Sequence, residues 1–210
     1  MGCSSENNDP VSITMTDEDG STSVDETTLT DVLDDLPLEQ PDVAETAGLL
    51  FMREEEKLAH DVYIKMFAEW NTKVFESISN SEQTHTDAIL TLLERYSIDD
   101  PVGSNGEGTF VDQYLQNLYD TLVAQGQASL IDALYVGAEI EELDLIDIQD
   151  LADALVGNED IKVVYENLMK GSRNHLRSFV SNLEKQGVTY VPQHLSQQVY
   201  DDIINSDIEN

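Results

Sequence analysis

Apolar residues recur at steps of three and four along most of this chain, the spacing that keeps side chains on one face of an α-helix. This periodicity predicts four long helices, over residues 43–70, 74–96, 129–155 and 159–186. It also predicts three short helices, over residues 29–38, 110–125 and 195–205. Alternating apolar and polar runs, which would indicate strands, are few, so the fold class is expected to be all-α.

The breaks between these helices indicate how the chain is organised. The stretch Asp99–Gly108 interrupts the periodicity and starts a long connection that carries an extra short helix. This spacing favours a four-helix bundle with one crossover connection over a simple up-down-up-down bundle. The bundle is expected over residues 45–190, where Gly187 ends the last long helix, and residues 191–210 are expected to form a C-terminal extension.

Residues 1–44 differ in composition from the rest of the chain. They are rich in Ser, Thr, Asp and Glu, contain few large apolar residues, and hold no Lys or Arg, since the first basic residue is Arg53. Such a composition is typical of a disordered tail or a tether.

The sequence GCSS around Cys3 resembles the point at which a bacterial or archaeal lipoprotein signal is cut. Cys3 would then carry the lipid, and the protein is expected at the cell surface or in the periplasm, touching the membrane only through Cys3. The alternative is a cytoplasmic protein in which Cys3 is one residue of a tail. As the single cysteine, it excludes an internal disulfide framework and a thiolate metal cluster.

The charge balance excludes one class of partner. With 43 acidic and 10 basic residues, the chain has a formal net charge of −33. A nucleic-acid-binding protein needs a basic surface to neutralise phosphates, so nucleic acid is not expected as a partner. No run of about 18 apolar residues is present in the chain, so no membrane-spanning helix is predicted from it.

Each of the four long helices carries carboxylates or imidazoles among its apolar positions. These are Glu56 in the first, Glu82 and His85 in the second, Glu139 and Glu142 in the third, and His175 in the fourth. Helical phase predicts that they face the interior, whereas their neighbours Glu54, Glu55, Glu141, Asp144 and Asp147 are expected to face solvent. Burying so many charges without compensation is unfavourable by many kcal/mol. Two divalent metal ions would neutralise four carboxylates, so the pattern favours a di-metal bundle.

The motifs REEEKLAHDVY, SEQTHTDAI, GAEIEELDL and GSRNHLRSF, in this order, resemble an uncharacterised ferritin-like family, DUF2202. The resemblance covers about residues 45–190 and implies a ferritin-like bundle in the ferritin and rubrerythrin superfamily of di-iron carboxylate proteins. That superfamily usually has a glutamate three residues before the histidine of the fourth helix, where this chain has Ser172. With Glu142 making up the count, six protein ligands remain, and the loss at Ser172 would leave an open coordination position.

Carboxylate and imidazole ligands favour two iron ions, with manganese or zinc as alternatives. The implied activity is oxidation of Fe(II) or reduction of O2 or peroxide. A reductase would need an external electron donor, because no Cys-x-x-Cys segment is present in the sequence. Tyr63 is a candidate donor to a ligating carboxylate or a site of electron transfer, with core packing as its alternative role. A non-catalytic metal-binding or structural bundle tethered at the cell surface is the alternative function, and a homodimer is possible because ferritin-like bundles often dimerise.

Overall fold

The computed structural model of this chain describes residues 11–17 and 20–210. Cys3, and with it the predicted lipid attachment, lies outside the described residues. No helix in the described part of the chain is long and apolar enough to cross a membrane.

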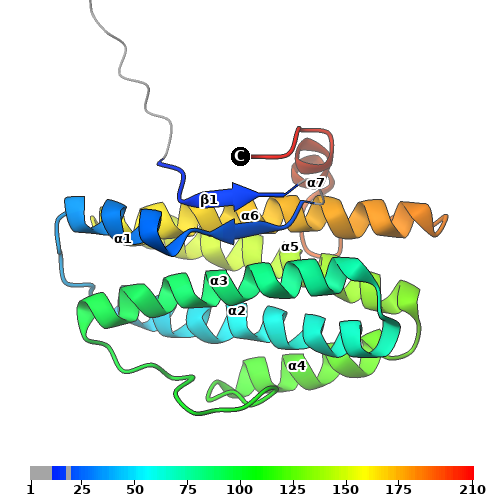
Figure 1. Ribbon diagram of the computed structural model, residues 1–210, viewed down its shortest axis with the longest axis horizontal. Coiled ribbons are helices and arrows are strands. Elements are labelled where there is room, and N and C mark those ends of the chain that lie inside the picture. The colour runs from blue at the N-terminus through cyan, green and yellow to red at the C-terminus, as the bar shows by residue number, and fades with distance from the viewer. Residues whose placement is uncertain (1–10, 18–19) are drawn as a thin grey trace, which may run out of the picture.

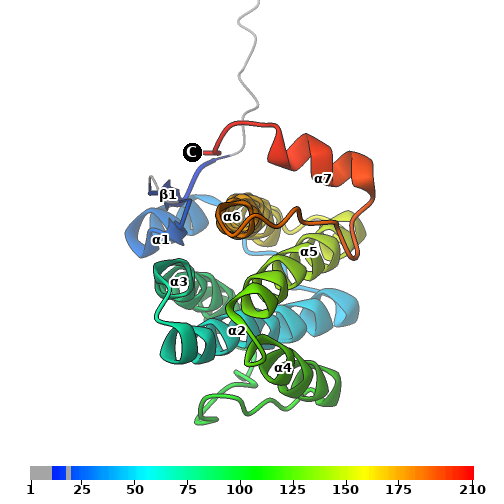
Figure 2. The ribbon, with the colours of Figure 1, turned by 90° about the vertical axis from the view of Figure 1, so that its right-hand side faces the viewer.

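Four long helices form the bundle that Figures 1 and 2 show. They are α2 (Val43–Trp70), α3 (Lys73–Tyr96), α5 (Leu130–Ala154) and α6 (Glu159–Lys185). Both α2 and α6 contact α3 and α5, so the four helices share one core. The prediction of an all-α bundle is confirmed, and the ends of the long helices agree with the predicted ones to within one residue.

Local sequence explains where the first long helix begins and ends. The Asp42 carboxylate accepts hydrogen bonds from the backbone N–H groups of Ala44 and Glu45, while the Glu45 side chain accepts from the N–H of Asp42. This reciprocal capping box satisfies N–H groups that have no partner inside the helix. Asn71 then adopts a left-handed conformation, with φ of 48°, and turns the chain directly into α3.

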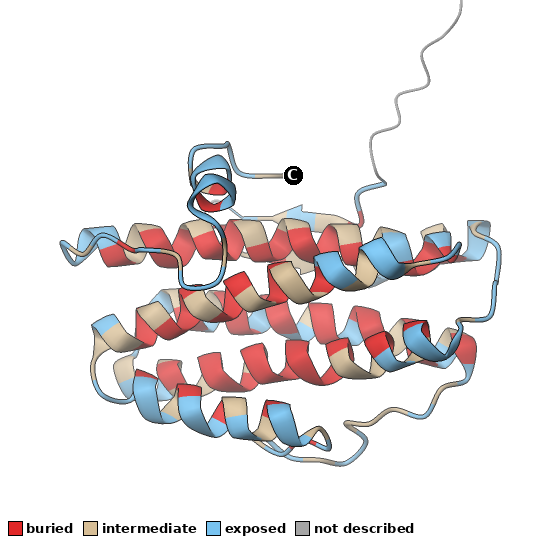
Figure 3. Ribbon diagram, turned by 180° about the vertical axis from the view of Figure 1, so that it is seen from behind, coloured by how far each residue is buried: buried red, intermediate tan, exposed pale blue. Residues whose placement is uncertain are grey.

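The long connection between α3 and α5 covers the outer side of α2. It contains the expected extra helix, α4 (Gln113–Gly126), which packs against both α2 and α5. The Glu54 carboxylate accepts from the backbone N–H groups of Val111 and Asp112 at 2.6 and 2.8 Å, which fixes the start of this helix. Consequently, α2 is buried on every side over residues 53–59 (Figure 3).

The N-terminal segment is folded where the structure describes it, which corrects the expectation of a disordered tail for residues 11–17 and 20–44. Strands β1 (Thr14–Thr16) and β2 (Thr22–Val24) form an antiparallel hairpin, and α1 (Glu26–Asp35) follows. The hairpin lies against α3 and α6. Ile13, Val24, Leu29 and Leu33 are buried and belong to the hydrophobic core, so these apolar residues attach the acidic segment to the bundle.

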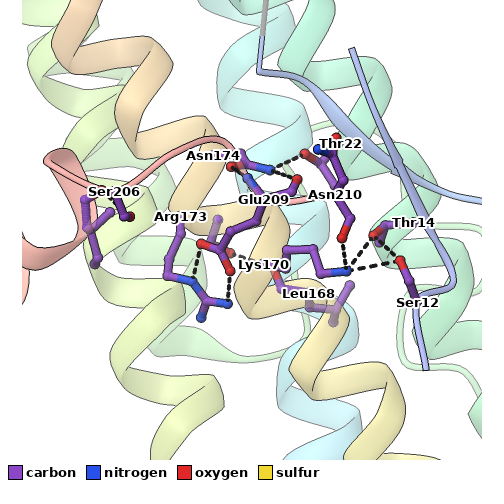
Figure 4. Close-up of polar contacts among 12 residues, drawn as sticks. Ser12, Thr14, Thr22, Leu168, Lys170, Arg173, Asn174, Ser206, Glu209 and Asn210 are labelled. Atoms are coloured by element: carbon purple, nitrogen blue, oxygen red, sulfur yellow. Dashed lines mark hydrogen bonds and ion pairs between the residues drawn. The ribbon is translucent and has the colours of Figure 1, made fainter. Parts of the chain in front are cut away.

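The two ends of the described chain meet over α6. A short helix, α7 (Gln197–Ile204), leads to the C-terminal residues, of which Glu209 forms an ion pair with Arg173 of α6. The Asn174 side-chain amide donates to the Thr22 hydroxyl and to the Glu209 carbonyl, both at 2.9 Å (Figure 4). Because Asn174 precedes His175, these bonds fix the hairpin close to one of the predicted site residues.

Candidate metal centre

The structure brings four of the six predicted site residues together in the core of the bundle. They are Glu56 of α2, Glu82 and His85 of α3, and His175 of α6, each at most 1% exposed. Two acids of α5, Glu141 and Asp144, complete the group and are equally buried. These six residues are called the core cluster below.

Glu82 is the centre of the core cluster. Its Oε2 atom lies 2.7 Å from Nδ1 of His85, and its Oε1 atom lies 2.8 Å from Nδ1 of His175. The two imidazole rings are stacked, with centroids 5.4 Å apart. Each ring also faces a second carboxylate: Glu56 Oε2 is 3.4 Å from His85 Nδ1, and Glu141 Oε2 is 3.5 Å from His175 Nδ1. The arrangement therefore consists of two similar halves that share Glu82.

Most of the inward-facing atoms of the core cluster lack the hydrogen bonds that buried polar groups normally make. Within the described part of the chain, no hydrogen-bond partner exists for either carboxylate oxygen of Asp144, for Glu56 Oε1, or for Glu141 Oε2. The Glu82 oxygens and the Nδ1 atoms of His85 and His175 face one another closely, without well-aligned hydrogen bonds. Since buried polar atoms are nearly always satisfied in proteins, a set of such atoms that converges on one place is a candidate cation site. Three of these residues, Glu82, His85 and His175, each offer one ligand atom, and these three atoms lie within 4.8 Å of one another.

Strand β2 of the N-terminal hairpin forms hydrogen bonds with the Nε2 atoms of both imidazole rings, on the side away from the carboxylates. His85 Nε2–H donates to the Thr22 carbonyl at 2.9 Å, and the Thr22 N–H donates to His175 Nε2 at 3.2 Å. Ser81 Oγ lies 3.2 Å from His175 Nε2. Gly171 leaves room for the His85 ring, because a Cβ atom there would lie 2.5 Å from its Cε1 atom. The Nδ1 atoms of both rings consequently point to the carboxylates.

Tyr63, a predicted participant, lies beside the core cluster. Its hydroxyl donates to Glu141 Oε1 at 2.6 Å and lies 3.3 Å from the Gly137 carbonyl. Its ring packs against Phe179, with centroids 5.1 Å apart. Tyr63 therefore both fills the core and orients one carboxylate, so the two roles considered for it are compatible.

Burial and mutual repulsion shift the pKa values of the carboxyl groups. Burial raises the pKa of Glu56 to about 7, against the influence of His85, and burial also raises the pKa of Glu141 to about 7. For Asp144, burial and the negative charges of Glu55 and Glu56 raise the pKa well above its usual range. These groups favour their neutral forms unless a positive charge is supplied.

The imidazoles supply part of that positive charge. Burial alone would lower the pKa of His175, but the charges of Glu82 and Glu141 raise it to about 9. For His85, Glu82 and Glu56 likewise outweigh burial and raise the pKa well above its usual value. Burial would raise the pKa of Glu82, yet the two histidines lower it below its usual range. Glu82 is thus the carboxylate that stays charged, between the Nδ1 atoms of the two rings.

The structure does not bring Glu139 and Glu142 to the core cluster, which corrects their predicted place. Glu142 is buried but turned to the C-terminal extension: it accepts from the Tyr190 hydroxyl at 2.8 Å and from three successive backbone N–H groups, those of Gln193, His194 and Leu195. Glu139 lies nearer the surface, 3.3 Å from His194 Nε2. Both acids attach residues 190–195 to α5.

The positions in the cluster that sequence reasoning missed are Glu141 and Asp144, which were expected to face solvent. The partial signal for both is the buried stripe Leu134, Gly137, Glu141, Asp144 and Ile148, at steps of three and four, which does not exclude Glu142 because α5 is buried on more than one side. Glu55 was also expected to face solvent but is only 3% exposed, because α2 is covered on all sides. The Ser172 hydroxyl donates to the Leu168 carbonyl at 3.2 Å. Asp144 keeps the number of acids in the cluster at four.

Comparison with known proteins places these residues in a family. The family model of an uncharacterized protein domain, DUF2202, matches residues 45–207. The uncharacterized protein MJ0754 of Methanocaldococcus jannaschii is 48% identical over 174 residues, which are 83% of this chain and 94% of that protein. The crystal structure of hypothetical protein MJ0754 matches with a TM-score of 0.81, covering 83% of this chain and 99% of the other. The hairpin that contacts both histidines precedes the segment matched by the family model.

Proposed function

We propose, on the premise that this chain belongs to the DUF2202 family of uncharacterized domains, that it is a dinuclear metal-carboxylate protein. Its activity would be oxidation of Fe(II) or reduction of peroxide or O2 in the bundle core. The observation that carries the proposal is the convergence of carboxylate oxygens and imidazole nitrogens that have no hydrogen-bond partner in the described chain.

The composition of the core cluster fits two divalent cations. Four carboxylates balance two such ions, and a pair of neutral imidazoles completes a donor set of the kind found in di-iron and di-manganese bundles. Glu56 and His85 would hold one ion, Glu141 and His175 the other, and Glu82 has one oxygen in each half. Asp144 is the remaining buried acid of the set. Without cations, burying these charges would be strongly unfavourable.

The residues around the cluster prepare it for such ions. The Thr22 carbonyl accepts from His85 Nε2–H, which leaves Nδ1 of that ring available for a cation. His175 Nε2 accepts from the Thr22 N–H, so a cation at Nδ1 would require the ring proton to move to Nε2, where Ser81 Oγ, 3.2 Å away, would accept it in place of that bond. Tyr63 donates to one oxygen of Glu141 and leaves the other free to face the cluster.

A bound pair of ferrous ions would supply two electrons, which with two protons reduce one hydrogen peroxide to two water molecules. The protein itself would exclude bulk water, since the six residues are at most 1% exposed. Tyr63 would keep its proton, because burial and the charge of Glu141 raise its pKa well above the usual value. It can therefore donate a hydrogen bond throughout the reaction.

Metal analysis and rapid mixing test the proposal. Protein purified without a metal-chelating tag should bind two transition-metal ions per chain, and the double variant His85→Ala/His175→Ala should bind none. Anaerobic Fe(II)-loaded protein mixed with peroxide should then oxidise faster than free Fe(II) in the same buffer. Oxidation no faster than that of free Fe(II) would overturn the enzymatic role. It would favour the second candidate, a non-catalytic bundle stabilised by metal, which the complete burial of the cluster also fits.

A further inference from the structure

A single residue of strand β2, Thr22, contacts both imidazole rings of the core cluster, but with opposite backbone groups. Its carbonyl oxygen lies 2.9 Å from His85 Nε2, whereas its N–H group donates to His175 Nε2 at 3.2 Å. A backbone carbonyl can only accept a hydrogen bond, and a backbone N–H can only donate one. The hairpin therefore bonds the two rings in opposite ways, although the carboxylates around them are arranged alike.

This difference matters when a ring binds a cation. Both rings turn Nδ1 toward Glu82, whose oxygens lie 2.7 Å from His85 Nδ1 and 2.8 Å from His175 Nδ1. An imidazole that binds a cation through Nδ1 carries its one proton on Nε2. In His85 this proton points to the Thr22 carbonyl, so the existing hydrogen bond is kept. The His85 half of the core cluster consequently needs no rearrangement to bind an ion.

His175 is in the opposite situation. A proton on its Nε2 atom would face the Thr22 N–H group, and two donors form no hydrogen bond with each other. Ser81 Oγ, 3.2 Å from Nε2, can accept this proton because the Ser81 hydroxyl donates its own to the Thr22 carbonyl. The buried N–H of Thr22 would then lose its acceptor, which is unfavourable. An ion at His175 has this consequence, and an ion at His85 does not.

The surroundings of Thr22 keep its N–H group directed at His175. The residue is fully buried, and its hydroxyl accepts from the Asn174 side-chain amide at 2.9 Å (Figure 4). The same amide donates to the Glu209 carbonyl, and the hydroxyls of Thr22 and Thr16 lie 3.1 Å apart. Turning the N–H group away from His175 would disturb these contacts, so the inequality of the two rings is part of the folded structure.

We propose that Thr22 makes the core cluster bind its two divalent ions in a fixed order. The half that contains Glu56 and His85 binds the first ion, and the half that contains Glu141 and His175 binds the second ion more weakly. Thr22 is a positioning residue, because it acts through the two rings. The inference rests on the proposed function and adds an order of binding to it. At limiting metal concentration, the chain would hold one ion in the His85 half.

Titration of the full-length, metal-free protein with Zn(II) tests this order. Two binding steps are expected, with the second dissociation constant roughly tenfold or more above the first. Zn(II) is diamagnetic, so nitrogen-15 NMR of the imidazoles can follow each ring. The His85 signals should change with the first equivalent of Zn(II), and the His175 signals should change only with the second. Simultaneous changes in both rings, or equal dissociation constants, would overturn the order and leave the dinuclear site intact.

Substitutions of Thr22 test whether its N–H group causes the difference. Thr22→Pro removes this group and keeps the carbonyl that His85 contacts, so the ratio of the two dissociation constants should fall about tenfold. Thr22→Ala loses the same hydroxyl but keeps both backbone groups, and it should retain the wild-type ratio. A folded Thr22→Pro chain with the wild-type ratio would overturn the role of Thr22.

Single histidine variants measure the two halves without altering the hairpin. His175→Ala should bind one Zn(II) ion with the first dissociation constant of the wild type. His85→Ala should bind one ion roughly tenfold more weakly, because the remaining ring faces the Thr22 N–H group. Equal affinities in these two variants would contradict the proposed order. A wild-type chain that binds no Zn(II) would overturn both this inference and the proposed function.

Discussion

Glu141 and Glu142 are neighbours on α5 and both are fully buried, yet they lie in opposite surroundings. Glu142 accepts hydrogen bonds from one hydroxyl and three backbone N–H groups, which is close to the capacity of a carboxylate. Glu141 receives one hydrogen bond, from Tyr63, and its other oxygen faces His175 and the core cluster without a partner in the described chain.

The difference between these two acids shows that burial alone does not identify a metal site. A buried carboxylate that is saturated by donors of its own chain has an architectural role, and here it fixes the C-terminal extension. A buried carboxylate with unsatisfied oxygens raises the free energy of the folded chain unless a proton or a cation is taken up. Each of the following experiments tests this distinction.

The largest expected effect concerns metal content. On the proposed function, Glu141→Gln should lose at least one of the two ions, because it removes a carboxylate from one half of the core cluster. Glu142→Gln should keep both ions, since its carboxylate faces residues 190–195. Elemental analysis of the two purified variants makes the comparison directly, and equal metal content in both would contradict the assignment of Glu141.

Removing the N-terminal hairpin is the second largest change. Deletion of residues 1–25 takes away the backbone groups of Thr22 that orient His85 and His175, so metal affinity should fall by roughly 10- to 100-fold. Thr22→Ala keeps those backbone contacts and should bind metal nearly as tightly as the wild type. Competition with a chromophoric chelator measures both. A truncated chain with wild-type affinity would show that the hairpin has no part in positioning the rings.

Substitutions of Glu141 and Glu142 should affect the stability of the fold in the opposite order to their effect on metal content, and here Glu142 is replaced by Ala so that its acceptor oxygens are lost. In the presence of a chelator, Glu142→Ala should lower the free energy of unfolding by roughly 3 kcal/mol, because several buried donors lose their acceptor. Glu141→Gln should change it by no more than about 1 kcal/mol, since Gln resembles the protonated carboxyl that Glu141 carries without metal. Urea unfolding monitored by circular dichroism gives both values, and early proteolysis after residue 188 should accompany the loss in Glu142→Ala.

A pH series separates protons from cations in the core cluster. Without metal, the folded chain holds protons on Glu56 and Glu141, with pKa values of about 7, and on His175, with a pKa of about 9. All three pKa values lie above those of the unfolded chain, so the folded state binds more protons. Its stability should fall as pH rises from about 5 to about 9, by at least about 2 kcal/mol.

Metal should flatten this pH dependence, because the cations replace the protons. Thermal unfolding across the same pH range, with a chelator and with saturating Co(II), provides the comparison. A metal-free chain whose stability is constant or rises between those pH values would mean that the acids of the core cluster are hydrated rather than buried.

The smallest expected effect is that of Tyr63→Phe. The variant keeps the aromatic packing against Phe179 and loses only the hydrogen bond to Glu141. Metal content should stay at the wild-type level, while affinity should fall about tenfold because Glu141 is less well oriented. A chelator competition carried out beside the wild type detects this difference, and an unchanged affinity would reduce Tyr63 to a packing residue.

The sequence by itself determined the long helices, the extra helix in the crossover connection, and four residues of the core cluster. Helical periodicity is a local property, and it is reliable where one face of a helix is buried and the other is exposed, as on α3 and α6. Glu82, His85 and His175 lie on such faces, and the structure brings them together.

Only the tertiary structure decided which acids of α5 enter the cluster and that Glu55 of α2 is buried. Both helices are buried on more than one side. The connection that contains α4 covers α2, and the C-terminal extension that Glu142 binds covers α5. A helix buried on several sides has no single apolar face, so phase could not separate Glu141 from Glu142 or place Glu55 inside. The hairpin of the acidic N-terminal segment was equally beyond local reasoning, because the backbone of Thr22 and its hydrogen bonds hold it against residues more than 50 positions away.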